Sequence, residues 1–177
     1  MIIVKERVKA LNLSTLFSWF IIYSYIGWLY ETMYCSFTSG KFVNRGFLYG
    51  PVCPIYGASI LLMILLTGRC RNAMSLFLSC ALIASVLEYV ASIGMELVYG
   101  RRWWDYSDKF LNINGRICLG AAVLFGVCGV VIVRYLHPLI IRYMEHNFTT
   151  NMIRKINVCL LALFIFDNLV SIQMSLI

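Results

Sequence analysis

Five long apolar segments occupy most of the 177-residue chain. They cover about 13–35, 51–67, 73–98, 117–136 and 156–176. Each comes near or exceeds the roughly 17–25 residues that a helix needs to cross a bilayer. The chain is 61% hydrophobic and 13% charged, whereas soluble domains are about 45–50% apolar and about 25% charged. We therefore predict an all-α integral membrane protein, a single domain (1–177) of about five transmembrane helices with a short second helix.

The basic residues stand in short clusters beside the apolar segments. The net charge is +7, but this placement is typical of topology signals and not of a nucleic-acid surface. Nine Lys and Arg residues lie in the N-terminus, the 68–72 link and the 134–155 stretch, and six lie in the 36–50 and 99–116 loops. The positive-inside rule then predicts a multi-pass protein of the cell membrane with a cytoplasmic N-terminus, an outward C-terminus and both loops outside.

Common catalytic and metal-binding motifs do not occur in this sequence. The seven cysteines form no CxxC pair and read as small buried hydrophobes. There is no HExxH, no P-loop and no GxSxG elbow. We therefore expect neither a cofactor nor a metal, and we do not expect the chain to be an enzyme.

Four acidic residues lie inside the apolar segments: Glu31, Glu88, Glu96 and Asp167. A charge at a helix centre costs on the order of 2.5–3.5 kcal/mol, so each acid needs a partner, a water-filled cavity or a proton. Glu31 and Glu96 fall near the outer ends of their helices, where Arg45 and Arg116 precede the next helices. This position predicts buried ion pairs. For Asp167, a role in helix packing is favoured over a role as a ligand.

Glu88 is the acid nearest the middle of its apolar segment. A small-residue face surrounds it at helical spacing, so it is expected to point inward. That face comprises Ala81, Ala84, Ser85, Ala91 and Ser92. Two interpretations stay open for Glu88: a structural hydrogen-bonding group, or a group on a substrate or proton path.

The 99–116 loop combines flat aromatic side chains with polar groups. Trp103, Trp104 and Tyr106 are singly typical of the membrane interface. The loop also carries the polar residues Asp105, Asn112, Asn114 and Arg116. Together these are the components of a polar pocket at a membrane mouth.

Residues 44–57, NRGFLYGPVCPIYG, would normally break a helix. Pro51 can occupy the first turn of the second helix, with Pro54 still inside that turn. Gly46 and Gly50 allow a tight bend or a close helix approach. A short spanning segment interrupted by Gly and Pro is the best sequence-level indicator of a transporter binding site. We expect this helix entrance to hold Arg45 against Glu31.

The two halves of the chain have a weak similarity in sequence. In each, an acid-bearing helix is followed by a loop rich in Gly and aromatic residues, and then by another helix. The best-matched points are Asn44-Arg45-Gly46 and Asn114-Gly115-Arg116. A parallel internal repeat would place both on one side of the membrane.

Three stretches, GWLYET, GKFVNRGFLYGPVCPIYG and WWDYSDKFLNINGRICLG, resemble the bacterial ABC-transporter type IV permeases, often called the CmpB-like family. The likeness runs from about Gly27 to Gly120. The family often has a proline between Asp-Tyr-Ser and the Asn of the third stretch, where this chain has Asp-Lys-Phe-Leu. The matching residues are Gly27, Trp28, Glu31, Asn44, Arg45, Gly46, Phe47, Gly50, Pro51, Pro54, Tyr56, Gly57, Asp105, Tyr106, Ser107, Asn112, Gly115 and Arg116.

The resemblance implies a permease component whose energy comes from a separate ATPase subunit docking on the cytoplasmic side, at Arg69 and Arg71 or at 137–154. In this reading Glu31, Arg45, Asp105 and Arg116 form a polar cluster at the outer mouth, and Glu88 lies deeper. The alternative is a non-transporting membrane protein that binds a ligand, senses one or assists assembly. A third reading is an intramembrane enzyme using Glu31 or Glu88. The sequence does not decide the substrate, its direction or whether the chain forms a homo-oligomer.

Overall fold

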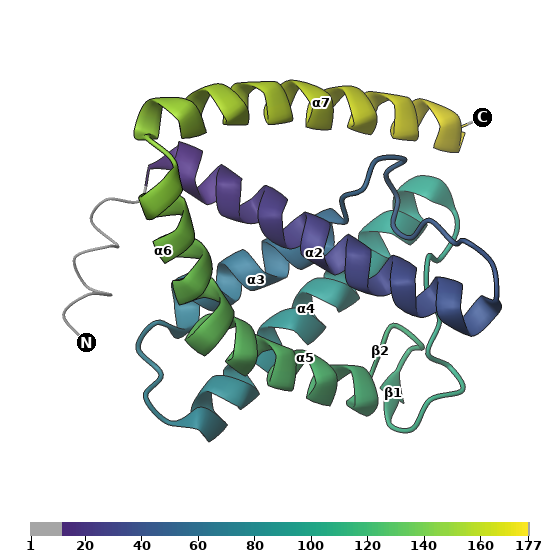
Figure 1. Cartoon of the computed structure of the whole chain (residues 1–177). Helices are drawn as coiled ribbons and strands as arrows, with labels where there is room; N and C mark the ends of the chain where they lie inside the picture. Colours follow the sequence, from purple (N-terminus) through teal and green to yellow (C-terminus); the bar gives the residue numbers. More distant parts are fainter. Residues whose placement is uncertain (1–11, 177) are drawn as a thin grey trace. The chain divides into compact units, whose positions relative to one another are not determined.

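The computed structural model describes residues 12–176 and is nearly all helical (Figure 1). Three helices are long: α2 (Leu13–Ser39), α4 (Ala73–Tyr99) and α7 (Thr150–Leu176). Helix α3 (Pro54–Thr67) is shorter, and α5 (Leu119–Val131), the π-helix η1 (Ile132–Leu136) and α6 (His137–Asn147) follow without a break. Strands β1 (Asn112–Ile113) and β2 (Ile117–Cys118) form a small antiparallel hairpin. The predicted all-α class with five helices is confirmed.

The described residues divide into two compact units. The first comprises residues 12–57 and 142–175, and the second comprises 58–141. The division falls inside α3 and inside α6, so each of these helices contributes to both units. The prediction of a single domain stays a prediction.

Within the described residues, three helices are long and apolar enough to cross a membrane. They are Ala73–Tyr99, Leu119–Asn147 and Thr150–Ser175. These spans make the chain a membrane protein. Helix α3 is apolar but has 14 residues, and α2 has the length but carries many Tyr, Trp and Ser side chains. That α2 and α3 also cross stays a prediction, as does the orientation of the termini.

Helices α2 and α4 are terminated by the same kinds of residue. Each has 27 residues, an Asn N-cap whose side chain accepts a backbone N–H, and a Gly C-cap with φ of 67° or 66°. These caps satisfy orphan groups at the helix ends, and glycine adopts the left-handed conformation at little cost. Helix α2 ends at Ser39, directly before its C-cap Gly40, and is therefore four residues longer than the predicted boundary at 35.

Other helix boundaries differ from the prediction for identifiable reasons. Pro51 lies outside α3, which begins at Pro54, so Pro54 takes the first-turn position that was expected for Pro51. The fourth helix continues to Asn147 instead of ending near 136. Its π-helical turn ends two residues before Pro138, whose ring would clash with the carbonyl four residues earlier in a regular α-helix. The last helix begins at Thr150 instead of 156.

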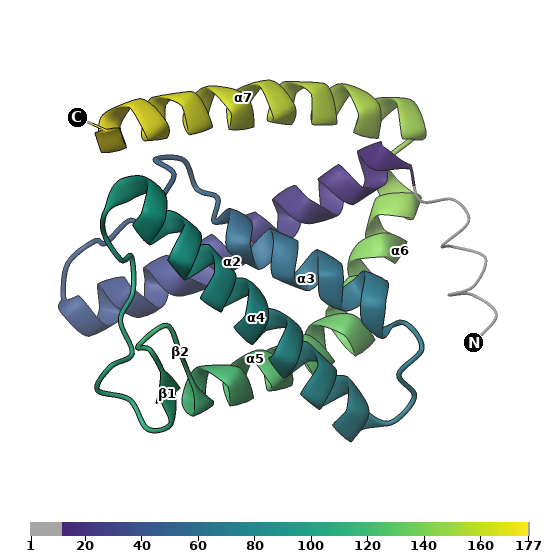
Figure 2. The same cartoon turned by 180° about the vertical axis from the view of Figure 1, so that it is seen from behind.

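Each unit has its own core. The first unit buries Trp19, Tyr23, Leu48 and Cys53. The second packs Met63, Leu76, Cys80 and Ala84 around the contact of α4 with α5, and the β1–β2 hairpin lies at the start of α5 (Figure 2). Gly129 of α5 faces the Cys80 side chain so closely that a Cβ would clash, which explains a small residue there. All seven cysteines lie among the described residues as free thiols.

Candidate functional site

The first unit contains a charged cluster around Glu31 of α2. Arg45 donates from Nε and Nη2 to Glu31 Oε1 at 2.9 and 2.8 Å. The Tyr56 hydroxyl donates to Glu31 Oε2 at 3.1 Å. Both carboxylate oxygens are thus engaged, and the two bonds from Arg45 have charge-assisted lengths. The predicted pairing of Glu31 with Arg45 is present, although the pair is partly exposed and not fully buried.

Neighbouring polar contacts fix the loop that carries Arg45. The Arg45 backbone N–H donates to the buried hydroxyl of Thr32 at 3.3 Å. Trp28 Nε1 donates to Asn44 Oδ1 at 2.7 Å, and Asn44 Nδ2 donates to the Tyr49 carbonyl. Burial lowers the pKa of Arg45, but the charge and hydrogen bonding of Glu31 outweigh this effect and raise that pKa above its ordinary value. The guanidinium is therefore a permanent cation in this loop.

The predicted glycines of this segment have distinct positions. Gly46 has a φ of 97°, which few other residues adopt. Gly27 lies against the Tyr56 ring, and Gly57 lies against Ser24 and the Phe20 carbonyl, in both cases with no room for a Cβ. These contacts bring the start of α3 close to α2, so that the Tyr56 hydroxyl can reach Glu31.

Helix α7 holds the same loop from another direction. The Gly50 N–H donates to both Asp167 oxygens at 3.1 and 3.0 Å, and the Tyr49 N–H donates to Ser171 Oγ at 3.2 Å. A Cβ at Gly50 would lie 2.7 Å from Asp167 Oδ2. Asp167 therefore binds the backbone of the loop that precedes α3.

The second unit contains a charged cluster around Glu96 of α4. Arg116 Nη2 pairs with Glu96 Oε2, and Arg102 Nε donates to Glu96 Oε1 at 3.1 Å. Arg116 Nη1 donates to the buried hydroxyl of Ser92 at 2.9 Å. The predicted pairing of Glu96 with Arg116 is present, again partly exposed. Arg102 and Ser92 complete the cluster, and sequence reasoning had not assigned them to it.

The buried Glu88 is joined to the loop between α4 and the hairpin. The Tyr106 hydroxyl donates to Glu88 Oε1 at 3.0 Å. Glu88 itself is 7% exposed, so the inward orientation predicted from the small-residue face is confirmed. The next residue, Tyr89, accepts a bond from Asn114 Nδ2 at 2.9 Å. The loop thus reaches along α4 as far as Glu88.

Hydrogen bonds within the 100–118 loop hold its shape. Asp105 Oδ1 accepts from the Ser107 hydroxyl at 2.6 Å and from the Ser107 N–H at 2.9 Å, an Asx turn. The Ser107 bonds, the hydroxyl's first, hold the pKa of Asp105 below its ordinary value. Trp104 Nε1 donates to the Arg116 carbonyl at 3.0 Å. Asp105 and Trp104 therefore serve the loop itself in this conformation.

Asn112 is the second organiser of this loop. Its Nδ2 donates to the carbonyls of Ser107 and Lys109, and its Oδ1 accepts from the Gly115 N–H, each at 3.0 Å. Gly115 has a φ of 66°, and a Cβ there would meet the side chains of Asp105 and Ser107. The hairpin turn therefore requires glycine at this position.

The two clusters are built from the same parts. In each unit a glutamate of a long capped helix pairs with an arginine from the following loop. A tyrosine hydroxyl binds a glutamate of the same helix. A buried hydroxyl, of Thr32 or Ser92, accepts a hydrogen bond from that arginine. That the two halves form an internal repeat stays a prediction. The expected single mouth, which would join residues of both units, stays a prediction.

The fold and these clusters define a helical membrane protein with glutamate–arginine clusters at the C-terminal parts of α2 and α4. The chain belongs to the family described as "Putative ABC-transporter type IV", which matches residues 18–172. The likeness to this family is thus confirmed and covers α7 as well as the motifs. The comparisons with curated proteins and with solved structures gave no match.

Proposed function

We propose that the chain is the membrane-embedded permease component of an ABC-type transporter. The observation that carries this proposal is the family match over residues 18–172. Because this sequence has no P-loop, ATP hydrolysis is assigned to a separate subunit. The proposal gives the chain no catalytic activity of its own.

The charged clusters are proposed to line the outer mouth of the pathway. Both lie toward the C-terminal ends of their helices, α2 and α4, and the positive-inside rule would place these ends outside. Glu88 is proposed as the deeper group, supported by its burial and by the Tyr106 bond. Intramembrane acids that face the protein interior typically mark substrate or ion pathways.

The proposed ATPase surface is the basic, cytoplasmic side of the chain, opposite the proposed outer mouth. Within the second unit Arg134 Nη2 donates to the Arg71 carbonyl at 2.8 Å, which ties the 68–72 link to the π-helical turn. This bond supports a link of fixed shape carrying Arg69 and Arg71.

The topology is tested by single cysteines. Ser39→Cys should react with an impermeant thiol reagent added outside and Asn72→Cys should not; the reverse pattern would overturn the orientation.

The transport role is tested at Glu88, since replacing it with Gln removes the charge but keeps the shape. Mass spectrometry would compare solutes inside and outside cells that carry wild type, Glu88→Gln or the control Asn168→Ala. We expect a solute whose distribution depends on the wild-type chain and is lost in Glu88→Gln at equal protein level. Asn168→Ala, a side chain bonded within α7, should behave as wild type.

A second candidate is a non-transporting membrane protein in which the clusters are structural. The engagement of both Glu31 oxygens favours it, because a carboxylate already bound by Arg45 and Tyr56 is satisfied without a ligand. If Glu88→Gln changes no solute distribution and Glu88→Leu changes only stability, this reading replaces transport.

A further inference from the structure

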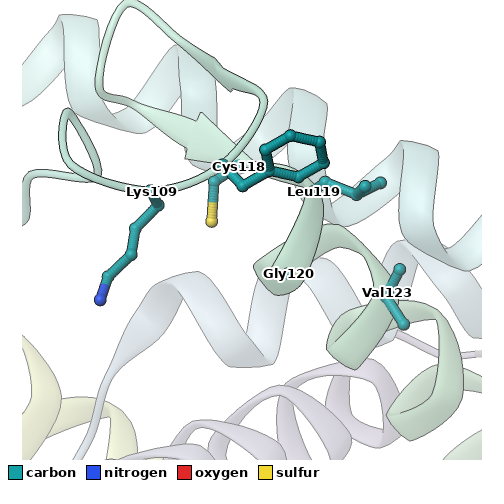
Figure 3. Close-up of a pocket in the computed structure, with 6 residues that line it drawn as sticks. Lys109, Cys118, Leu119, Gly120 and Val123 are labelled. Carbon is teal, nitrogen blue, oxygen red and sulfur yellow. The ribbon is translucent and has the colours of Figure 1, made fainter.

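An open hollow of about 400 Å³ lies in the second unit, where the 100–118 loop meets the start of α5. Figure 3 shows that Lys109 and Cys118 extend in the same direction from the loop and β2, whereas Leu119, Gly120 and Val123 come from α5. The remaining lining residue is Phe110. The volume falls in the range of small-molecule sites, about 300–1,000 Å³. Tyr106, Arg102 and Arg116, which bind Glu88 and Glu96, do not line this hollow.

The lining is almost entirely apolar, and one of its six residues carries a charge. Lys109 is the charged residue among the six, and its side chain is exposed. The alkyl part of the Lys109 side chain can lie along the apolar wall while its ammonium stays in water. An anionic group joined to an apolar chain complements such a surface.

The surrounding loop has the composition of a segment that enters a bilayer surface. Phe110, Leu111 and Ile113 are 77%, 63% and 55% exposed. Exposed large apolar side chains next to a lysine favour contact with lipid, because the rings and alkyl groups leave water while the ammonium stays at the headgroups. Helix α5 begins a membrane-spanning stretch, so its first residues lie near the membrane boundary.

We propose that this hollow binds an anionic glycerophospholipid from the surrounding membrane. Its phosphate lies at Lys109, and one acyl chain lies along Leu119, Gly120 and Val123. Binding is noncovalent and independent of whether the chain transports a solute. It fixes the loop that supplies Tyr106 and Arg116 to the second cluster.

Tryptophan fluorescence tests the proposal, because Trp103 and Trp104 lie on this loop. The full chain would be reconstituted in vesicles that contain equal mole fractions of brominated phosphatidylglycerol or brominated phosphatidylcholine, and bromine would quench nearby tryptophans. For wild type we expect a preference of about fivefold for the anionic lipid, the effect of one lysine near an anionic surface. Equal quenching by the two lipids would overturn the proposal.

Two variants probe the two parts of the site. Lys109→Gln should remove the preference for the anionic lipid, whereas Lys41→Gln, in an exposed loop position of the other unit, should keep it. Gly120→Leu should reduce quenching by both lipids, since its side chain would fill the hollow. A Cβ at Gly120 meets no atom within 4 Å, and Gly94 is equally open, so Gly94→Leu is the matched control.

Three outcomes would contradict the lipid site. The first is a preference that survives Lys109→Gln. The second is equal loss in Gly120→Leu and Gly94→Leu. The third is removal of the preference by millimolar inorganic phosphate, which would assign the site to a soluble anion instead of a lipid.

Discussion

Asp167 accepts the Gly50 N–H with both carboxylate oxygens, although the two residues are 117 positions apart in the chain. This contact connects α7 to the loop that carries Arg45. Because a lost acceptor leaves a backbone N–H without its partner, Asp167→Ala should lower the free energy of unfolding by about 1–3 kcal/mol. Chemical unfolding in detergent would measure the change. Asn168→Ala should stay within about 0.5 kcal/mol, and equal effects of the two variants would contradict the role of Asp167.

The Glu31–Arg45 pair should show energetic coupling. Arg45→Met removes both bonds to Glu31 Oε1 and should cost about 1.5–3 kcal/mol, toward the low end because the pair is partly exposed. The double variant Arg45→Met/Glu31→Leu should cost less than the sum of the single changes, since no carboxylate is left without its cation. A double-mutant cycle by urea unfolding measures this coupling. A coupling energy near zero would show that the Glu31–Arg45 pair does not stabilise the fold.

Gly115 should tolerate alanine less well than Gly100 does. Both have a φ of 66°, so an alanine is strained at either position by about 1–2 kcal/mol. Only at Gly115 would the new Cβ also meet Asp105 and Ser107, whereas at Gly100 it meets nothing within 4 Å. Thermal unfolding should therefore give a clearly lower midpoint for Gly115→Ala than for Gly100→Ala. Equal unfolding midpoints would contradict this prediction, because they would mean that the loop around Asp105 moves to accommodate the new Cβ.

The charge of Asp105 should stabilise the loop in a pH-dependent way. Its pKa is lower in the folded protein than in the unfolded chain, because Ser107 binds the ionised carboxylate. The stabilisation is therefore complete above the unfolded pKa of about 3.9 and is lost as the pH falls through the lower folded pKa. The unfolding midpoints of wild type and Asp105→Asn should differ at pH 7 and converge below about pH 4. A constant difference down to pH 3 would contradict this assignment.

Sequence reasoning succeeded where the signal was local. The helix-end positions of Glu31 and Glu96, each followed by a loop arginine, were sufficient to predict both ion pairs. The small residues spaced around Glu88 were sufficient to orient it inward. Such patterns work because a helix fixes which residues share a face.

Other features had no local signal. The Asp167–Gly50 contact joins segments that only tertiary packing brings together, and it uses a backbone N–H, which every non-proline residue has. The end of the fourth helix was placed too early because α6 is polar and contains Pro138, while the π-helical turn accommodates that proline. Arg102 was missed as a partner of Glu96, since several arginines in one loop can reach the same helix end.

The central claim, that the chain is the permease component of an ABC-type transporter, is tested most directly by what copurifies with it. The full-length tagged chain would be isolated from its native membrane in mild detergent, and bound proteins would be identified and counted by mass spectrometry. We expect a P-loop ATPase subunit at a fixed stoichiometry. Complete function of the chain in a preparation without any ATPase would contradict the account.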